Sequence, residues 1–188
     1  MPAWVWLVAM VFLILCYPLN IWKDAPLFPT PKGILDGIQT FAPLPRGARI
    51  LDAGCGLGDG LRELHRIFPE ARLIGWEWSW ALRLLCGIRC PFATVRRADM
   101  WSGDWSDFEM VYMFQRPESM ERAARKAQAE LRPGALLLSL EFQAVGLTPV
   151  AVLKNRIDKP VWIYRMTDEL SGQRHGAGNS GPCTQETG

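Results

Sequence analysis

The stretch Ile50-Leu51-Asp52-Ala53-Gly54-Cys55-Gly56-Leu57-Gly58-Asp59-Gly60 decides the fold, because an apolar run leads there into alternating glycines. The segment after it, 58–68, places Leu61, Leu64, Ile67 and Phe68 on one face of a helix. Alternating glycines permit a tight turn and let a ligand approach the backbone without a Cβ in the way. The helix N-terminus would present N–H groups to a carboxylate. The stretch therefore predicts a strand, a ligand-binding turn and a helix.

The rest of the chain repeats this alternation of short apolar runs and helical segments. Strands are expected at 49–53, 72–76, 93–97, 109–114, 136–142 and 161–166, and helices at 58–68, 81–88 and 117–131. Such alternation is typical of parallel strands joined by crossover helices. We therefore predict an α/β fold with a Rossmann-like, doubly wound, mostly parallel sheet.

The spacing of the glycines argues against a dinucleotide site. The G-x-G-x-x-G fingerprint would need a third glycine at Asp59 or at Leu61, depending on where it starts. The run instead resembles motif I of class I methyltransferases, in which an acidic residue stands two positions before G-x-G-x-G. This resemblance implies S-adenosylmethionine as the cofactor, with its methionine part held by the set Asp52, Gly54, Cys55, Gly56 and Gly58.

Two further acidic landmarks follow in strand-sized steps. Glu77 directly follows an apolar strand about 20 residues beyond the glycines, where a carboxylate can accept two hydrogen bonds from a ribose diol. By resemblance to the same family, Glu77 and Trp78 are expected at the ribose. The segment Asp99-Met100-Trp101 follows the third strand and resembles the part of the family that meets adenine.

A narrower resemblance covers residues 32–166. It is to the membrane-anchored protein-lysine methyltransferases of the ATP synthase c-subunit type and their bacterial relatives. The residues that carry it are Gly75-Trp76-Glu77, Asp99-Met100-Trp101, Tyr112 to Met120, Glu130 to Ala135, Thr148-Pro149 and Val161 to Tyr164. Gly146-Leu147 stands where that family would have an aromatic pair. The resemblance implies a protein lysine as the methyl acceptor.

The acceptor site is expected beyond the fourth strand. No Asn-Pro-Pro-Tyr sequence occurs there, which disfavours adenine and glutamine as acceptors. An amine acceptor needs little proton chemistry, because the site has chiefly to desolvate it and align it with the methyl carbon. Tyr112, Gln115 and Glu141 are the residues we expect to orient that amine.

The N-terminal residues predict a membrane anchor. Residues 2–22 contain no charged side chain and are long enough to cross a hydrocarbon layer of about 30 Å. Trp4, Trp6, Tyr17 and Trp22 lie near its two ends, as interfacial aromatics do. A secretory signal peptide is the alternative, but it would need a basic n-region and a small-residue cleavage site. Lysine and arginine follow the apolar stretch, which predicts a single-pass protein of the inner (cytoplasmic) membrane with its catalytic domain in the cytoplasm.

The domain plan that follows has four parts: an anchor at 1–22, a proline-rich linker at 23–47, a methyltransferase domain at 48–168 and a disordered tail at 169–188. Twenty-one basic residues against 19 acidic ones give no field that would favour nucleic acid. Two histidines and five scattered cysteines offer no metal-binding pattern.

Three functions remain open at this level. The first is methylation of a protein lysine at the membrane. The second uses the same cofactor on a lipid or quinone-like acceptor, and the third is a cofactor-binding membrane module without turnover. The tryptophans near the expected cofactor edge, among them Trp78 and Trp80, either form a membrane-facing or substrate-facing surface or pack in the core.

Overall fold

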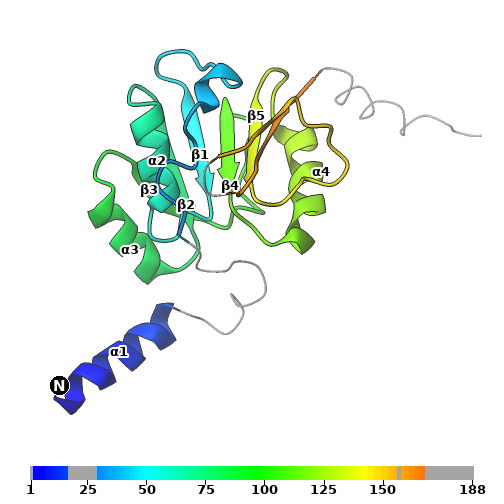
Figure 1. Cartoon of the computed structure of the whole chain (residues 1–188). Coiled ribbons are helices and arrows are strands. Elements are labelled where there is room, and N and C mark those ends of the chain that lie inside the picture. Colours follow the sequence, from blue (N-terminus) through cyan, green and yellow to red (C-terminus); the bar gives the residue numbers. More distant parts are fainter. Residues whose placement is uncertain (1, 17–28, 156–157, 168–188) are drawn as a thin grey trace, which may run out of the picture.

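The computed structural model describes residues 2–16, 29–155 and 158–167, and within them seven strands form one sheet. The strand order is β3-β2-β1-β4-β5-β7-β6 (Figure 1). The strands are β1 (Arg49–Ala53), β2 (Arg72–Glu77), β3 (Thr94–Arg97), β4 (Met110–Met113), β5 (Leu136–Leu140), β6 (Ala151–Leu153) and β7 (Val161–Arg165). Strands β1 to β5 run parallel to one another, whereas β7 runs antiparallel to both β5 and β6. The predicted Rossmann-like, mostly parallel sheet is confirmed.

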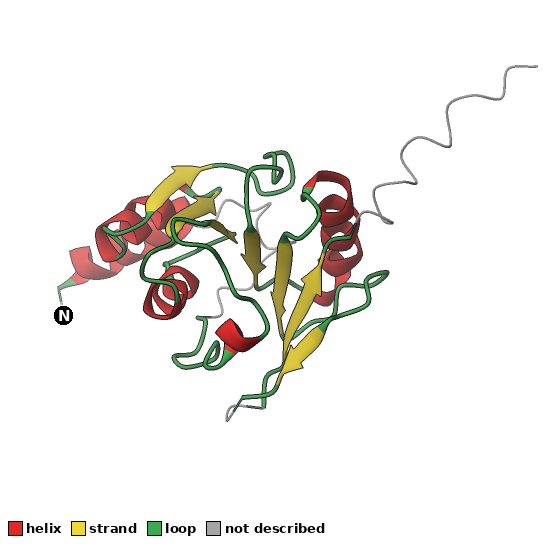
Figure 2. Cartoon of the chain, turned by 90° about the horizontal axis from the view of Figure 1, so that it is seen from above, coloured by secondary structure: helices red, strands yellow, loops and turns green. Residues whose placement is uncertain are grey.

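Helices cover both faces of the sheet (Figures 1 and 2). On one face lie α2 (Asp59–Ile67), α3 (Trp80–Arg89) and the short 3-10 helix η2 (Ile38–Thr40). On the other lies α4 (Met120–Glu130), which continues from the 3-10 helix η3 (Pro117–Ser119). Each face is sealed by its own cluster of buried apolar side chains.

The strand order reverses between β1 and β4. Strand β1 pairs with β2 on one side and with β4 on the other, and both pairings are parallel. Ligands of open α/β sheets bind outside the carboxyl ends of the strands at such a switch point. The glycine turn after Ala53 and the segment after Met113 both leave the sheet there.

One strand was missed by the sequence reading. Strand β6 has only three residues, all half-buried, and it pairs only with β7. Three residues are too few for a periodic apolar pattern, so its place in the sheet depends on the pairing with β7. The other expected strands are present, with ends within two residues of the expected ones.

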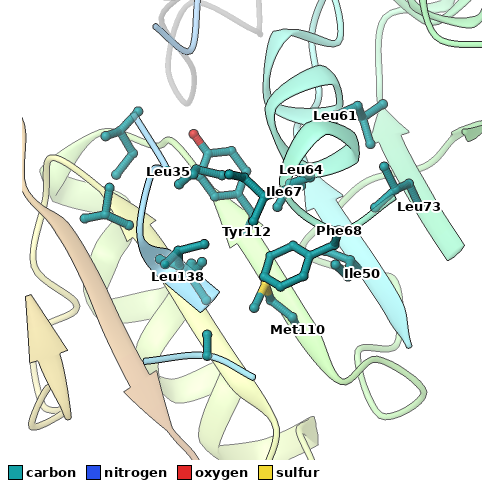
Figure 3. Close-up of a cluster of buried hydrophobic side chains, with 14 of the residues drawn as sticks. Leu35, Ile50, Leu61, Leu64, Ile67, Phe68, Leu73, Met110, Tyr112 and Leu138 are labelled. Atoms are coloured by element: carbon teal, nitrogen blue, oxygen red, sulfur yellow. The ribbon is translucent and has the colours of Figure 1, made fainter. Parts of the chain in front are cut away.

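Part of the expected linker packs into the domain. Ile34, Leu35, Ile38 and Ala42 are fully buried in the cluster that also contains Tyr112 and Leu138, several members of which appear in Figure 3. The folded unit therefore extends further toward the N-terminus than the expected boundary at residue 48. The prolines at 31, 43 and 45 set the bends, but the apolar residues between them seal the sheet.

The first helix, α1, spans Ala3–Cys16 and contains no charged residue. Among the described ranges, no helix is both long enough and apolar enough to span a membrane. Residues 17–22 of the expected anchor, 23–28 of the expected linker and the expected disordered tail lie outside the described residues.

Candidate cofactor and acceptor site

The glycine turn is tied to the neighbouring strand. The N–H groups of Gly54 and Cys55 both donate to the carbonyl of Trp76, each at 3.0 Å. Gly56 has a φ of +51°, and a Cβ placed on it would meet nothing within 4 Å. The turn thus leaves open space directly above its backbone, as a ligand lying on the main chain requires.

Gly60 lets α2 begin close to the sheet. A Cβ on this residue would stand 2.5 Å from Asp52 Oδ2 and 2.8 Å from Tyr112 Cε1. This is the close helix-to-strand approach that a third glycine commonly serves in nucleotide-binding turns. The sequence reading had not given Gly60 a role, although its place in the glycine series was the available signal.

Asp52 is buried beneath this helix start. Its Oδ2 has no hydrogen-bond partner among the described residues. Burial, reinforced by the nearby Cys90 and Glu77, raises the pKa of Asp52 to about 8, while a hydrogen bond from the Leu61 N–H acts in the opposite direction. A buried carboxyl with one unpaired oxygen beside a ligand turn is suited to a cationic ligand, because the positive charge would favour the ionised carboxylate.

Glu77 connects two loops at the end of β2. Its Oε2 accepts the Gly56 N–H at 3.0 Å, and its Oε1 accepts the Ser79 N–H at 2.8 Å. Burial raises the pKa of Glu77, and these backbone donors act in the opposite direction. A carboxylate has about four acceptor positions, so the same group can hold the turn and still accept from a diol.

The segment Asp99 to Trp101 closes the same edge. Asp99 Oδ1 accepts the Trp101 N–H at 2.9 Å, which fixes the turn that follows β3. Met100 is buried, and its Sδ lies 3.6 Å from the position of a Cβ on Gly54. The Trp101 ring lies under the Arg122 guanidinium at 4.4 Å. The structure therefore brings Met100 to the glycine turn and stacks Trp101 against α4.

Tyr112 lies beside Asp52, since these two residues are partners in the β1–β4 register. Its ring is buried, and Figure 3 shows its hydroxyl directed away from the apolar cluster. That hydroxyl is 3.0 Å from Thr30 Oγ1. Burial raises the pKa of Tyr112. The sequence reading missed Thr30, because 82 residues separate the pair.

Gln115 leaves β4 and closes over Gly54. Its Nε2 donates to the Ala53 carbonyl at 3.5 Å and would be 2.7 Å from a Cβ on Gly54. The side chain is 1% exposed, and its Oε1 has no hydrogen-bond partner among the described residues. Gln115 thus places a neutral, unsatisfied acceptor beside the glycine turn.

Glu141 is held differently from the other two expected acceptor residues. It has a φ of +71° at the end of β5, and its Oε2 pairs with Lys159 Nζ at 2.5 Å. The same ammonium lies 5.5 Å from the centre of the Phe114 ring. Glu141 therefore lies at the carboxyl edge of the sheet but is engaged by a lysine of its own chain.

Three free thiols fill the space behind the glycine turn. Cys55 and Cys86 have their Sγ atoms 3.7 Å apart, and Cys90 Sγ donates to the Gly58 carbonyl at 3.4 Å. A Cβ on Gly58 would come within 2.8 Å of both Cys86 and Cys90 Sγ atoms. The hydrogen bond with Cys55 and burial raise the pKa of Cys86. The thiols therefore stay protonated and pack as small apolar side chains.

Comparison with known proteins identifies the class of enzyme to which the domain belongs. The ANTKMT methyltransferase domain model matches residues 52–151, more than half of the chain. A protein-lysine N-methyltransferase of Saccharolobus islandicus is 25% identical over 148 residues, which are 74% of this chain and 92% of that protein. A trans-aconitate 2-methyltransferase of Variovorax paradoxus is 30% identical over 100 residues, but the chain spans only 39% of its length.

A solved structure shares the fold. It is an RNA methyltransferase from Salinibacter ruber in complex with S-adenosyl-L-homocysteine, with a TM-score of 0.67 and 20% identity. The match covers 75% of this chain and 95% of that one. The domain is that of an S-adenosylmethionine-dependent methyltransferase, and the chain belongs to the ANTKMT methyltransferase domain family.

Proposed function

We propose that this methyltransferase acts on the side-chain amine of a protein lysine and that it works at the inner membrane. The observation that carries the lysine assignment is the match to the protein-lysine N-methyltransferase, which extends over 92% of that relative. The trans-aconitate methyltransferases match over a much smaller share of their length. A near-complete match includes the acceptor side of a domain, whereas a partial one can be limited to cofactor motifs.

The residues around the glycine turn fit the cofactor. S-adenosylmethionine supplies a methyl group on a positively charged sulfonium, together with an ammonium and a carboxylate. Asp52 offers a buried carboxyl whose Oδ2 has no hydrogen-bond partner among the described residues, and Gly56 leaves room over the backbone. We assign the ribose to Glu77 and the adenine end to Asp99, while Trp78 stands beside them half-exposed.

Gln115 suits an amine acceptor. A neutral amide oxygen accepts a hydrogen bond from an amine without stabilising its charged ammonium form as strongly as a carboxylate would. That distinction matters because only the uncharged amine has a lone pair for attack on the methyl carbon. Tyr112, whose hydroxyl is held by Thr30, lies three residues before Gln115 in the chain and orients the acceptor through shape. Glu141, whose carboxylate pairs with Lys159 at the carboxyl edge of the sheet, would have to exchange that lysine for the lysine of the substrate in order to orient the acceptor.

The membrane location rests on the N-terminal residues. Residues 2–22 form an uncharged stretch, of which α1 is the described part. Thr30, which follows shortly after, contacts Tyr112 at the carboxyl end of β4. An anchor attached at this point would hold the acceptor side of the sheet near the bilayer, with the membrane as partner and a membrane-associated protein as substrate.

The test is transfer of a labelled methyl group from S-adenosylmethionine into membranes by the full chain. Protein and lipid are then separated, and the protein is hydrolysed to its amino acids. We expect the label in methyllysine. Label in the lipid fraction would replace the lysine assignment with a lipid acceptor, and cofactor binding without transfer to either fraction would indicate a non-catalytic module.

The matched control uses two glycines of similar geometry. Gly56→Arg places a long side chain over the cofactor turn. Gly134→Arg places the same side chain in the turn before β5, at the amino end of the strands and away from the cofactor turn. Both glycines have positive φ and open space around the Cβ position. Methyllysine should disappear with Gly56→Arg and persist with Gly134→Arg.

A further inference from the structure

An apolar stripe runs along the outer face of α3. Trp80, Leu84 and Ile88 are 50%, 49% and 70% exposed and recur every four residues. This spacing aligns them on one side of a helix. The opposite side of α3 is buried, with Ala81, Leu82 and Cys86 packed against the domain. The stripe is therefore not needed for the core.

The segment that carries this stripe is basic. Residues 78–98 contain four arginines and no acidic residue, and one of the four, Arg89, pairs with Asp59 of α2 at 2.8 Å. Arg96 and Arg97 are exposed on β3, the edge strand that α3 contacts, and the Arg97 guanidinium lies 5.1 Å from the centre of the Trp78 ring. Exposed Trp, Leu and Ile with flanking arginines are the composition of a helix lying in the interface of an anionic membrane.

The first helix, α1, lies near α3 and adds further exposed apolar side chains to this region. Helix α1 approaches α3 to within 8 Å between Cα atoms, and the two lie on the same side of the molecule in Figure 1. The helix leaves its own apolar side chains exposed, namely Trp4, Trp6, Leu7, Val8, Met10 and Val11. Apolar surface on both elements therefore faces solvent in one region of the protein.

We propose that the α3 stripe, defined as Trp80, Leu84 and Ile88, lies on the surface of an anionic lipid bilayer beside α1. The side chains enter the headgroup region while the neighbouring arginines contact lipid phosphates. This contact rests on the proposed membrane location and deepens it, because a single anchor leaves the domain free to rotate. A second contact fixes the carboxyl edge of the sheet, where α3 begins, relative to the membrane plane.

The experiment is hydroxyl-radical footprinting of the full chain reconstituted in vesicles of phosphatidylcholine mixed with phosphatidylglycerol. Modification of Trp80, Leu84 and Ile88 is compared with that of Val150, which is 55% exposed beside β6 at the opposite edge of the sheet. We expect the stripe to lose most of its modification while Val150 keeps it. Modification of the stripe at a rate similar to Val150 overturns the proposal, and so does equal protection without vesicles, which would indicate self-association.

Two variants sharpen the result. The double variant Leu84→Glu/Ile88→Glu should restore modification of Trp80 on vesicles, and Val150→Glu should leave Trp80 protected. The three substituted side chains are all exposed, so the core is not disturbed. The methyl-transfer test described above, made with the same protein preparation, separates the two proposals: methyllysine without protection of the stripe refutes only the stripe contact, and protection without methyllysine refutes only the lysine acceptor.

Discussion

Asp52 and Tyr112 are directly paired across β1 and β4, at the point where the strand order reverses. Both side chains are buried beneath the first turn of α2, and burial raises the pKa of each. The charge of Asp52 contributes to the raised pKa of Tyr112. Both groups at the bottom of the site thus favour the protonated form, and a cationic ligand would favour ionisation of Asp52.

Asp52→Asn should change how stability depends on pH. The pKa of Asp52 is about 8 in the folded protein, against about 3.9 in an unfolded chain. Between these pH values the folded protein binds one proton more than the unfolded chain. The stabilisation of the folded state by this proton is complete below about pH 4 and is lost as pH rises through about 8. Denaturant unfolding at several pH values should therefore show a decline for the wild type and a flatter profile for Asp52→Asn. Identical profiles would contradict the assignment.

Cofactor binding should release a proton from Asp52. A cationic ligand lowers the pKa of a neighbouring carboxyl, so the affinity for S-adenosylmethionine should rise with pH up to about 8. Below that pH the rise approaches tenfold per unit for one linked proton, as an order-of-magnitude limit. Calorimetry in buffers of different ionisation enthalpy measures the release. The Asp52→Asn variant should bind S-adenosylmethionine without releasing a proton.

Gly56→Arg should abolish S-adenosylmethionine binding while the domain remains folded. The open space above Gly56 would receive the arginine, and no packed neighbour has to move. Gly56→Ala isolates the cost of the positive φ, which is roughly 1–2 kcal/mol of stability. Calorimetric titration checks the binding and circular dichroism the fold. Unchanged cofactor affinity in Gly56→Arg would place the pocket elsewhere.

Glu77→Ala should weaken both the cofactor site and the fold around it. The substitution removes the acceptor for the Gly56 and Ser79 N–H groups, each worth roughly 1–3 kcal/mol if left buried and unpaired. Glu77→Gln keeps one acceptor oxygen and should lose less stability, yet still bind the cofactor poorly. Thermal unfolding and titration of both variants check this. Equal stability of Glu77→Ala and the wild type would exclude the bridging role.

Asp99→Ala should weaken cofactor binding by roughly 1–3 kcal/mol, the usual loss for a hydrogen bond to a charged group. Asp99 also caps its own turn through the Trp101 N–H, so the alanine variant alone would mix two effects. Asp99→Asn keeps an oxygen for that turn and serves as the control. Cofactor-bound coordinates in which adenine lies away from Asp99–Trp101 would refute this placement.

The sequence determined the class of fold because its signals are local. The run from Ile50 to Gly60 encodes a strand, a turn and a helix within eleven residues, and that whole unit is present. Glu77 and Asp99 could be placed at the carboxyl edge of the sheet from the sequence because Glu77 ends β2 and Asp99 lies two residues beyond β3.

Only the tertiary structure decided which groups meet. The bond between Thr30 and Tyr112, the closure of Gln115 over Gly54 and the pairing of Glu141 with Lys159 each join different elements. The burial of Ile34 and Ile38, which lie in a proline-rich segment, likewise depends on packing against distant parts of the chain. No local pattern specifies such contacts, because they arise from the order and twist of the strands, which bring distant carboxyl ends to one edge of the sheet.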